Sequence, residues 1–221
     1  MKANKAYKYR IYPNMLQEEM LAKTFGCVRF IYNKMLSDKL EYYKETGKML
    51  SNTPAQYKKD FEFLKEVDSL ALSNAQLQLQ AAYRNFFRDK SVGFPKFKSK
   101  KYSRQSYTTN LVNGNIRIES GKIRLPKIGE IRIKLHREIP KGYAIKSVTV
   151  SKESTGKYFV SVLTEYETKD VKRALDKEKS LGLDYSSPCF YVDSNGYTSN
   201  MPHFYREAEA KLAREQRRLS R

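Results

Sequence analysis

Long hydrophobic runs are missing from this sequence, and their absence excludes one large class of proteins. No stretch of 18 consecutive apolar residues occurs in the 221 residues, whereas a transmembrane helix needs roughly 20. Residues 1–11 also lack the pattern of a signal peptide. We therefore expect a protein that has no membrane as a partner.

Cysteine and histidine are scarce, which limits the metal sites and disulfides that the chain can form. Cys27 and Cys189 are the only cysteines, and neither belongs to a CxxC pair. Both lie within apolar patterns, so we interpret them as buried thiols of a reducing compartment. His136 and His203 are isolated, and we assign neither of them a catalytic or metal-binding role. These 221 residues therefore predict no zinc site.

Acidic residues are the minority, and the resulting charge points to a polyanionic partner. The chain has 43 Lys and Arg against 24 Asp and Glu, which gives a formal net charge of +19. It has no Trp, but 17 Tyr and 11 Phe are spread among the basic residues. Cations that pair with phosphates and rings that stack on bases are the combination that nucleic-acid binding requires.

The positive charge is densest between residues 93 and 141, which hold 13 Lys or Arg and 3 Glu. Aromatic residues are threaded through this stretch, which a merely solvated run of charges would not need. We predict that it contacts nucleic acid, together with basic residues of neighbouring elements and of the C-terminal helix. The candidate residues for backbone pairing or stacking are Lys8, Arg10, Arg84, Arg88, Phe94, Lys96, Phe97, Lys98, Lys100, Lys101, Tyr102, Arg104, Arg217 and Arg218.

Helical periodicity dominates the region before this stretch. Asn14 with Gln17 three positions later is a helix start, and apolar residues then recur at helical spacing to about residue 44. A second start lies at Thr53, whose helix would bury Tyr57, Phe61 and Leu64. A third helix is predicted over residues 70–90. Its polar positions are amides that suit either base-edge reading or a solvated or inter-helix polar face: Asn74, Gln76, Gln78, Gln80 and Asn85.

Alternating apolar residues predict strands on both sides of the helices. One strand covers residues 5–12, and the others lie between residues 116 and 162, separated by turns that contain glycine. Their outward positions are mostly basic. We expect the first strand to join the later ones in a single sheet. The predicted fold class is α+β, a small β-barrel with the helices inserted in it.

The end of the chain contains a separate pattern with one notable carboxylate. Residues 181–184 form a short apolar strand that ends in Asp184, and residues 193–196 have the composition of a type I′ hairpin turn. RNase H-like nucleases begin their active sites in this way, but they need two or three more carboxylates to hold paired metal ions. Residues 167–179 are charged and predict a linker, and residues 202–221 predict a helix that is cut short. We expect the rest of such a site to lie outside this sequence.

Four segments of the chain resemble the TnpB family of RNA-guided DNA endonucleases, which bacterial insertion sequences carry and which is related to miniature type V CRISPR effectors. In order, they are residues 5–14 (KAYKYRIYPN) with 29–33 (RFIYN), residues 82–88 (AYRNFFR) with 93–98 (GFPKFK), residues 125–129 (LPKIG) and residues 182–184 (GLD). Together they span nearly the whole chain.

The resemblance implies a layout in three parts. Residues 1–13 and 92–166 would form a wedge β-barrel, and residues 14–91 a helical recognition domain inserted in it. After the linker, residues 180–221 would begin a RuvC nuclease domain of the RNase H type. The partners would be a guide RNA and target double-stranded DNA, where base pairing supplies the sequence and the protein reads a short flanking motif. The location would be the bacterial cytoplasm, in association with the nucleoid.

The resemblance also assigns roles to residues of this sequence. Asp184 would be a catalytic ligand of Mg²⁺, and its partner carboxylates and a Zn²⁺ ribbon would lie in a missing C-terminal part or on a second chain. The positions that match motif-reading residues, or lie near them, are Ser69, Leu70, Ser73, Asn113, Asn52 and Gln56. Asn113 is equally suited to be a plain turn residue, since Val112-Asn113-Gly114-Asn115 is a good β-turn.

Three functional classes stay open at this point. The first is a nuclease whose remaining site residues lie elsewhere, which the presence of Asp184 favours. The second is a shortened module that binds RNA and DNA without cutting, in the manner of a repressor. The third is a transposase accessory protein, which would bind duplex DNA without any RNA.

Overall fold

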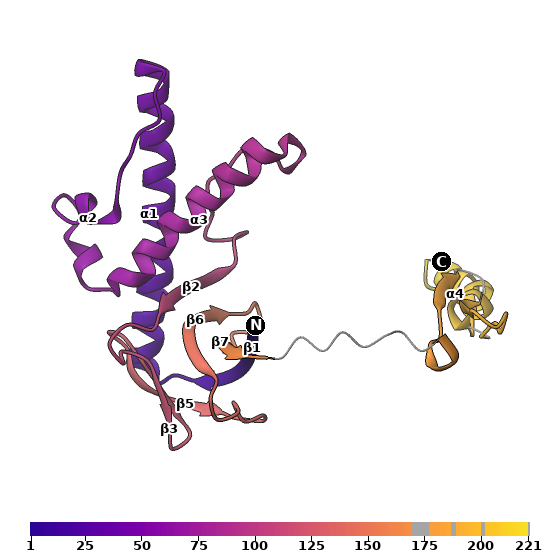
Figure 1. Cartoon of the computed structure of the whole chain (residues 1–221). Coiled ribbons are helices and arrows are strands. Elements are labelled where there is room, and N and C mark those ends of the chain that lie inside the picture. Colours follow the sequence, from indigo (N-terminus) through magenta and orange to yellow (C-terminus); the bar gives the residue numbers. More distant parts are fainter. Residues whose placement is uncertain (169–176, 187–188, 200–201, 221) are drawn as a thin grey trace. The chain divides into compact units, whose positions relative to one another are not determined.

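The computed structural model describes residues 1–168, 177–186, 189–199 and 202–220. The chain divides into two compact units, Met1–Lys169 and Asp170–Arg221 (Figure 1). No helix in these described ranges is long and apolar enough to cross a membrane.

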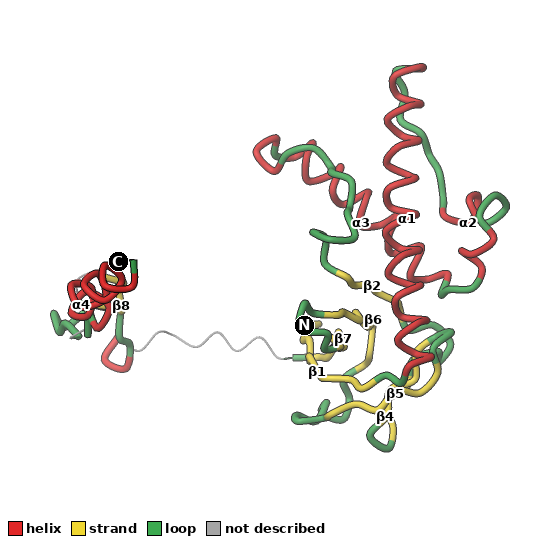
Figure 2. Tube along the Cα trace, turned by 180° about the vertical axis from the view of Figure 1, so that it is seen from behind, coloured by secondary structure: helices red, strands yellow, loops and turns green. Residues whose placement is uncertain are grey.

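The first unit contains an antiparallel sheet that curls into a half-barrel, which the yellow strands of Figure 2 trace. Its strands follow the order β2-β6-β7-β1-β5-β4-β3. The predicted α+β class is confirmed. The sheet is open rather than a closed barrel, because its edge strands β2 and β3 do not pair with each other within the described residues. The strand bounds are β1 (Lys2–Tyr12), β2 (Gln105–Asn110), β3 (Arg117–Glu119), β4 (Lys122–Leu125), β5 (Gly129–Lys134), β6 (Ala144–Lys152) and β7 (Tyr158–Glu167).

Strand β1 lies in the middle of this sheet, which confirms the prediction that it joins the later strands. It pairs with β7 along residues 2–11 and with β5 along residues 10–12. Because successive strand residues point to opposite faces, Tyr7, Tyr9 and Ile11 are buried in the core while Lys8 is exposed. Residues 13–104, including all the helices of this unit, are therefore an insertion between β1 and β2.

Helix α1 (Met15–Thr46) begins and ends at the signals that the sequence contains. The Asn14 side chain accepts the Gln17 N–H at 2.9 Å, and the Gln17 side chain accepts the Asn14 N–H at 3.0 Å. This reciprocal pair is a capping box. Gly47, at φ 67°, ends the helix by donating its N–H to the Tyr43 carbonyl. The Gln17 amide also donates to the Glu130 carbonyl at 2.8 Å, which ties the helix start to β5.

Helix α3 (Ser69–Arg88) crosses α1 and rests on β2 (Figure 1). Asp68 is buried at its start and links the helix to the sheet. One carboxylate oxygen of Asp68 accepts the Leu70 N–H at 3.0 Å, and the other accepts the hydroxyl of Thr109 on β2. The polar contact that caps the helix therefore also fixes its position over the sheet.

The helix expected from Thr53 to Leu64 is shorter than predicted. Helix α2 (Pro54–Tyr57) stops after one turn, and a 3₁₀ helix, η1 (Glu62–Lys65), follows. The break lets Phe61 pack edge-to-face on Phe30 of α1, with ring centroids 4.8 Å apart, while Leu64 is fully buried. Contacts with α1 therefore override the local helical periodicity. A further 3₁₀ turn, η2 (Lys90–Val92), follows α3.

The second unit consists of a hairpin and a helix. Strand β8 (Leu183–Ser186) pairs with β9 (Phe190–Asp193), and helix α4 (Phe204–Leu219) follows; a 3₁₀ turn, η3 (Lys177–Lys179), precedes β8. Of the predicted linker, Glu167 belongs to β7 and residues 169–176 lie outside the described residues.

The type I′ assignment is wrong for the turn at residues 193–196, which follows β9 and leads back to a bridge between Val192 and Thr198. A type I′ turn needs positive φ at both central residues, but only Gly196 after them has one, at 82°. The Asp193 carboxylate accepts the N–H groups of Asn195 at 2.8 Å and Tyr197 at 2.9 Å. This side chain therefore stabilises a different turn, in which glycine takes the left-handed position after the central pair.

Candidate nucleic-acid interface

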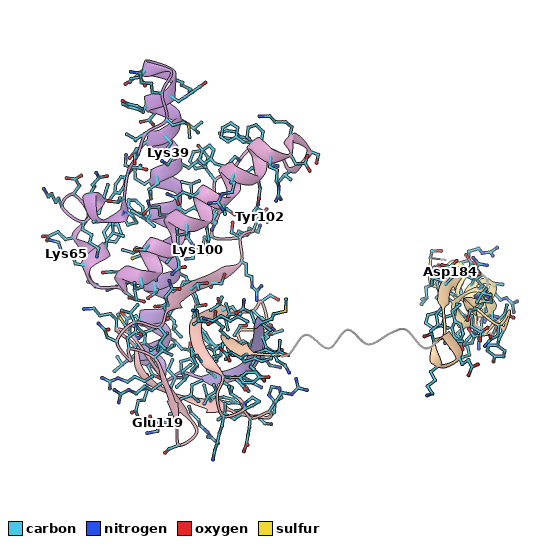
Figure 3. All side chains as sticks on the ribbon, viewed as in Figure 1. Lys39, Lys65, Lys100, Tyr102, Glu119 and Asp184 are labelled. Carbon is cyan, nitrogen blue, oxygen red and sulfur yellow. The ribbon has the colours of Figure 1, made fainter. Side chains whose placement is uncertain are left out.

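The connection between α3 and β2 presents most of the predicted basic and aromatic residues to solvent. Lys96, Lys100, Lys101 and Arg104 are exposed, and Tyr102 is 83% exposed. Figure 3 labels Lys100 and Tyr102 in this connection, with their side chains drawn as sticks. A tyrosine so exposed among four cations contributes little to folding, so these residues are available to a partner.

One lysine of this segment, Lys98, holds the segment in place instead of projecting freely. Its ammonium lies 4.0 Å from the ring centroid of Tyr32 on α1 and donates to the Gln78 side chain on α3 at 2.8 Å. Burial lowers the pKa of the Lys98 ammonium. The side chain of Asn33 on α1 also forms two hydrogen bonds with the backbone of Lys98. It accepts the Lys98 N–H and donates to the Lys98 carbonyl, each at 2.8 Å.

Replacing Asn33 by alanine is expected to loosen this segment. Two hydrogen bonds to the Lys98 backbone are lost, so the free energy of unfolding should fall by about 2 kcal/mol. Urea unfolding measures that change, and trypsin should cut faster after the neighbouring lysines. Asn85→Ala, on the exposed surface of α3, is the control and should leave both values unchanged. Equal trypsin rates for Asn33→Ala and the parent would contradict the anchoring role.

A pocket of about 800 Å³ lies between this segment and the β6–β7 turn. Its lining includes Lys100, Lys101, Arg104 and Lys152, with Glu153 as its only acidic residue. The Glu153 carboxylate is paired with Lys8 at 2.9 Å. The acidic group is therefore already neutralised by a residue of β1, and the pocket keeps a net positive charge.

The predicted motif-reading residues gather around the start of α3, with different availability. Ser69 and Ser73 are exposed one turn apart on α3, and the Ser69 hydroxyl accepts from Lys58 at 2.7 Å. Leu70 is half-buried and Gln56 is exposed. Asn52 is buried, and its amide donates to the Tyr57 hydroxyl at 2.6 Å. Asn52 therefore supports this surface and does not reach out from it.

Asn113 lies in a turn that follows β2. Its φ is 51°, a left-handed value that asparagine tolerates better than most residues, so the turn role is evident. The side chain is exposed and lines a pocket of about 420 Å³ together with Arg117, Arg124 and Lys127. Asn113 can therefore both form the turn and contact DNA, because the turn leaves its side chain exposed among three cations.

Three of the amide side chains of α3 form hydrogen bonds within the protein, which the sequence did not indicate. Asn74 donates to the Leu70 carbonyl at 2.9 Å, Gln76 to the Asn52 carbonyl at 3.2 Å, and Gln78 accepts from Lys98. The first contact lies within α3, and the other two join α3 to residues outside the helices, so these three amides are already engaged within the protein. Sequence reasoning missed the anchoring roles of Asn33 and Gln78, because both depend on contacts between residues far apart in the chain.

The remaining basic candidates are distributed over several elements. Arg84 and Arg88 are exposed on the second half of α3. Arg10 is half-buried, with its guanidinium 4.9 Å from the ring centroid of Tyr12. In the second unit, Arg217 and Arg218 are exposed on α4, and Arg218 pairs with Glu215 at 3.3 Å.

Asp184 lies on β8, opposite Val192 of β9, and is exposed (Figure 3). No group of three or more His, Cys, Asp and Glu side chains that could hold a metal ion occurs among the described residues. Asp193 is committed to its turn through two backbone N–H groups. Among the described residues, Asp184 thus has no grouped carboxylates beside it, and one carboxylate does not by itself fit a two-metal site.

Comparison with known proteins shows what this chain is similar to. A family profile of the IS605 OrfB type, described as a helix-turn-helix domain, matches residues 1–48. In the structure these residues contain β1 and the whole of α1, so they form one strand and one helix. A cryo-EM structure of the Cas12f1-sgRNA-target DNA complex matches with a TM-score of 0.48 and 11% identity, covering 100% of this chain and 70% of that chain.

Two curated relatives match almost the full length of this chain. The “Putative RNA-guided DNA endonuclease” of Streptomyces pristinaespiralis is 35% identical over 98% of this chain and 54% of its own length. The “Putative RNA-guided DNA endonuclease InsQ” of Escherichia coli is 30% identical over 100% of this chain and 55% of its own length. The chain spans about half the length of both. It belongs to the TnpB family, also called the IS605 OrfB family.

Proposed function

We propose that this chain is the nucleic-acid-handling part of an RNA-guided DNA endonuclease. The observation that carries the proposal is the exposed basic and aromatic segment before β2, which Asn33, Tyr32 and Gln78 hold in place beside a cationic pocket. An anchored row of cations suits a regular phosphate backbone better than a flexible charged tail would, because less conformational entropy is lost on binding.

Within this proposal, the two parts of the first unit have different tasks. The cationic pocket beside the sheet would hold the guide RNA by its backbone. The surface at the start of α3, with Ser69, Ser73 and Gln56, and the Asn113 turn would read the short motif beside the target DNA. Base pairing between guide and target would supply the remaining specificity.

Cutting is proposed for the whole protein and not for these 221 residues. Asp184 would contribute one carboxylate to a RuvC site, whose bound Mg²⁺ ions would activate water and stabilise the leaving oxygen. Because no group of such ligands surrounds Asp184 among the described residues, the other ligands would come from further residues of the complete enzyme.

The guided function has a direct test in the full-length protein purified from its host. The protein should carry RNA, and RNase treatment should abolish its sequence-specific binding to target DNA. A mock treatment without RNase is the control. Specific binding to duplex DNA that survives complete RNA removal would overturn the proposal and favour a transposase accessory protein.

A binding module that does not cut is the second candidate. Both candidates predict RNA-dependent binding, so cutting separates them. The RNA-loaded protein would cleave target DNA on addition of Mg²⁺ if it is an endonuclease, and would bind the same DNA uncut if it is a repressor-like module.

A further inference from the structure

An aromatic cluster lies where α3 ends, away from its motif-reading start. Phe94 packs edge-to-face on Tyr83 and Phe86, with ring centroids 5.5 Å and 5.3 Å apart, and Phe86 lies 5.4 Å from Phe87. Gly93, at φ 79°, allows the turn that folds Phe94 back onto the helix. The cluster is thus a fixed arrangement of rings on a helix end.

Much of this cluster is exposed to solvent. Phe87 is 60% exposed, Phe94 41%, and the neighbouring Val92 59%. The Lys90 ammonium lies 4.0 Å from the ring centroid of Phe86 and 5.0 Å from that of Phe87. Exposed apolar surface that is rimmed by polar groups marks interaction sites, because leaving it in water costs solubility without stabilising the fold.

The charges around the cluster restrict what can cover it. Arg84, Arg88, Lys90 and Lys96 are all exposed, and Asp89 is the only acidic residue between residues 83 and 98. The Asp89 carboxylate accepts the N–H of Ser91 at 2.9 Å and its hydroxyl at 2.7 Å, and these bonds lower its pKa. A second copy of the chain would place like charges against one another. The occupant should therefore be anionic and should have flat apolar faces.

We propose that Phe87, Phe94 and Val92 form a platform on which unpaired nucleotides stack, while Arg84, Arg88 and Lys90 face their phosphates. Bases have flat faces and carry phosphates at regular spacing, so they match both properties of the surface. The inference rests on the proposed function, because it requires that the chain holds nucleic acid. Unpaired RNA and unpaired DNA share this chemistry.

The test uses full-length protein freed of RNA with RNase and a high-salt wash. Fluorescence anisotropy would measure its affinity for labelled 12-nucleotide oligo(U), oligo(dT), an abasic oligonucleotide of the same length and a blunt duplex. Phe87→Leu should weaken binding of the oligo(U), the oligo(dT) or both by roughly five- to tenfold, the loss of about one stacked base. The salt dependence should not change, because no charge is removed. Binding of the abasic oligonucleotide should be unaffected.

Two further variants show whether such a loss is specific. Phe87→Tyr keeps a ring and should bind like the parent. Phe63→Leu is the matched control, because Phe63 is a 39% exposed ring in a second cluster, 5.2 Å from Phe30. It should have no effect.

The outcomes separate this inference from the proposed function. A loss confined to oligo(U) assigns the platform to RNA, and one confined to oligo(dT) assigns it to DNA. Parent protein that binds no oligonucleotide would overturn the proposed function itself. Parent protein that binds while Phe87→Leu binds equally well would overturn the platform alone. An equal loss of affinity for the abasic oligonucleotide would also overturn the platform. So would a parent protein that sediments as a dimer and becomes a monomer on Phe87→Leu.

Discussion

Replacing Asp184 by asparagine in the full-length, RNA-loaded protein is expected to abolish Mg²⁺-dependent cutting and to leave target binding intact. Loss of a group that only orients a metal ligand lowers activity roughly 10- to 100-fold. Loss of a ligating carboxylate should therefore lower the cleavage rate by more than about 100-fold. Binding should be unchanged, because Asp184 lies in the second unit, outside the anchored basic segment. A time course of DNA cleavage, with gel-shift affinity measured in parallel, gives both quantities.

Asp193→Asn is the matched control for Asp184→Asn on the same hairpin. Asparagine keeps the side-chain oxygen that accepts the N–H groups of Asn195 and Tyr197, so the turn should form as before. It also removes one negative charge, as the test variant does, and cutting should persist. Undiminished cutting by Asp184→Asn would mean that Asp184 is a strand residue without a role in metal binding.

Replacing Lys96, Lys100, Lys101 and Arg104 together by alanine is expected to weaken RNA binding and to flatten its salt dependence. Each cation that meets a phosphate of single-stranded nucleic acid contributes about 0.7 to the slope of log affinity against log salt. Loss of all four should therefore reduce the slope by about three. Lys98 is left in place, because it anchors the segment and its loss would confuse folding with binding.

A variant with the same loss of charge elsewhere serves as the control for this experiment. Lys44, Lys48, Lys59 and Lys65 are exposed on the helical part of the first unit. Their replacement by alanine lowers the net charge equally, so any difference between the two variants reports on position. Filter binding over a series of salt concentrations measures both slopes. Equal slopes would remove the segment before β2 from the interface.

The features that the sequence predicted well depend on contacts between near neighbours. The start of α1 follows from Asn14 and Gln17, which are three residues apart and cap each other. The buried face of β1 follows from the alternation of Tyr7, Tyr9 and Ile11. The basic, aromatic character of residues 93–104 is likewise a property of composition, so its exposure was predictable without a fold.

One error arose where a distant contact competes with local helical preference, and the other where a nearby side chain selects a different turn. The helix after Thr53 ends at Tyr57, because this break lets Phe61 pack on Phe30 of α1 and places Leu64 in the core. The turn at residues 193–196 was assigned from its composition, but the Asp193 side chain binds two backbone N–H groups and selects another geometry.

The charge of this protein, most of its elements and its family resemblance follow from the sequence alone. The packing of the elements decides that β1 lies between β5 and β7, that Lys98 is an anchor, and that Asn52 is buried beneath the surface where it was expected to read DNA. Asn33 meets Lys98 across 65 positions of the chain. No local sequence pattern predicts such a long-range contact, because it depends on how the helices and the sheet pack together.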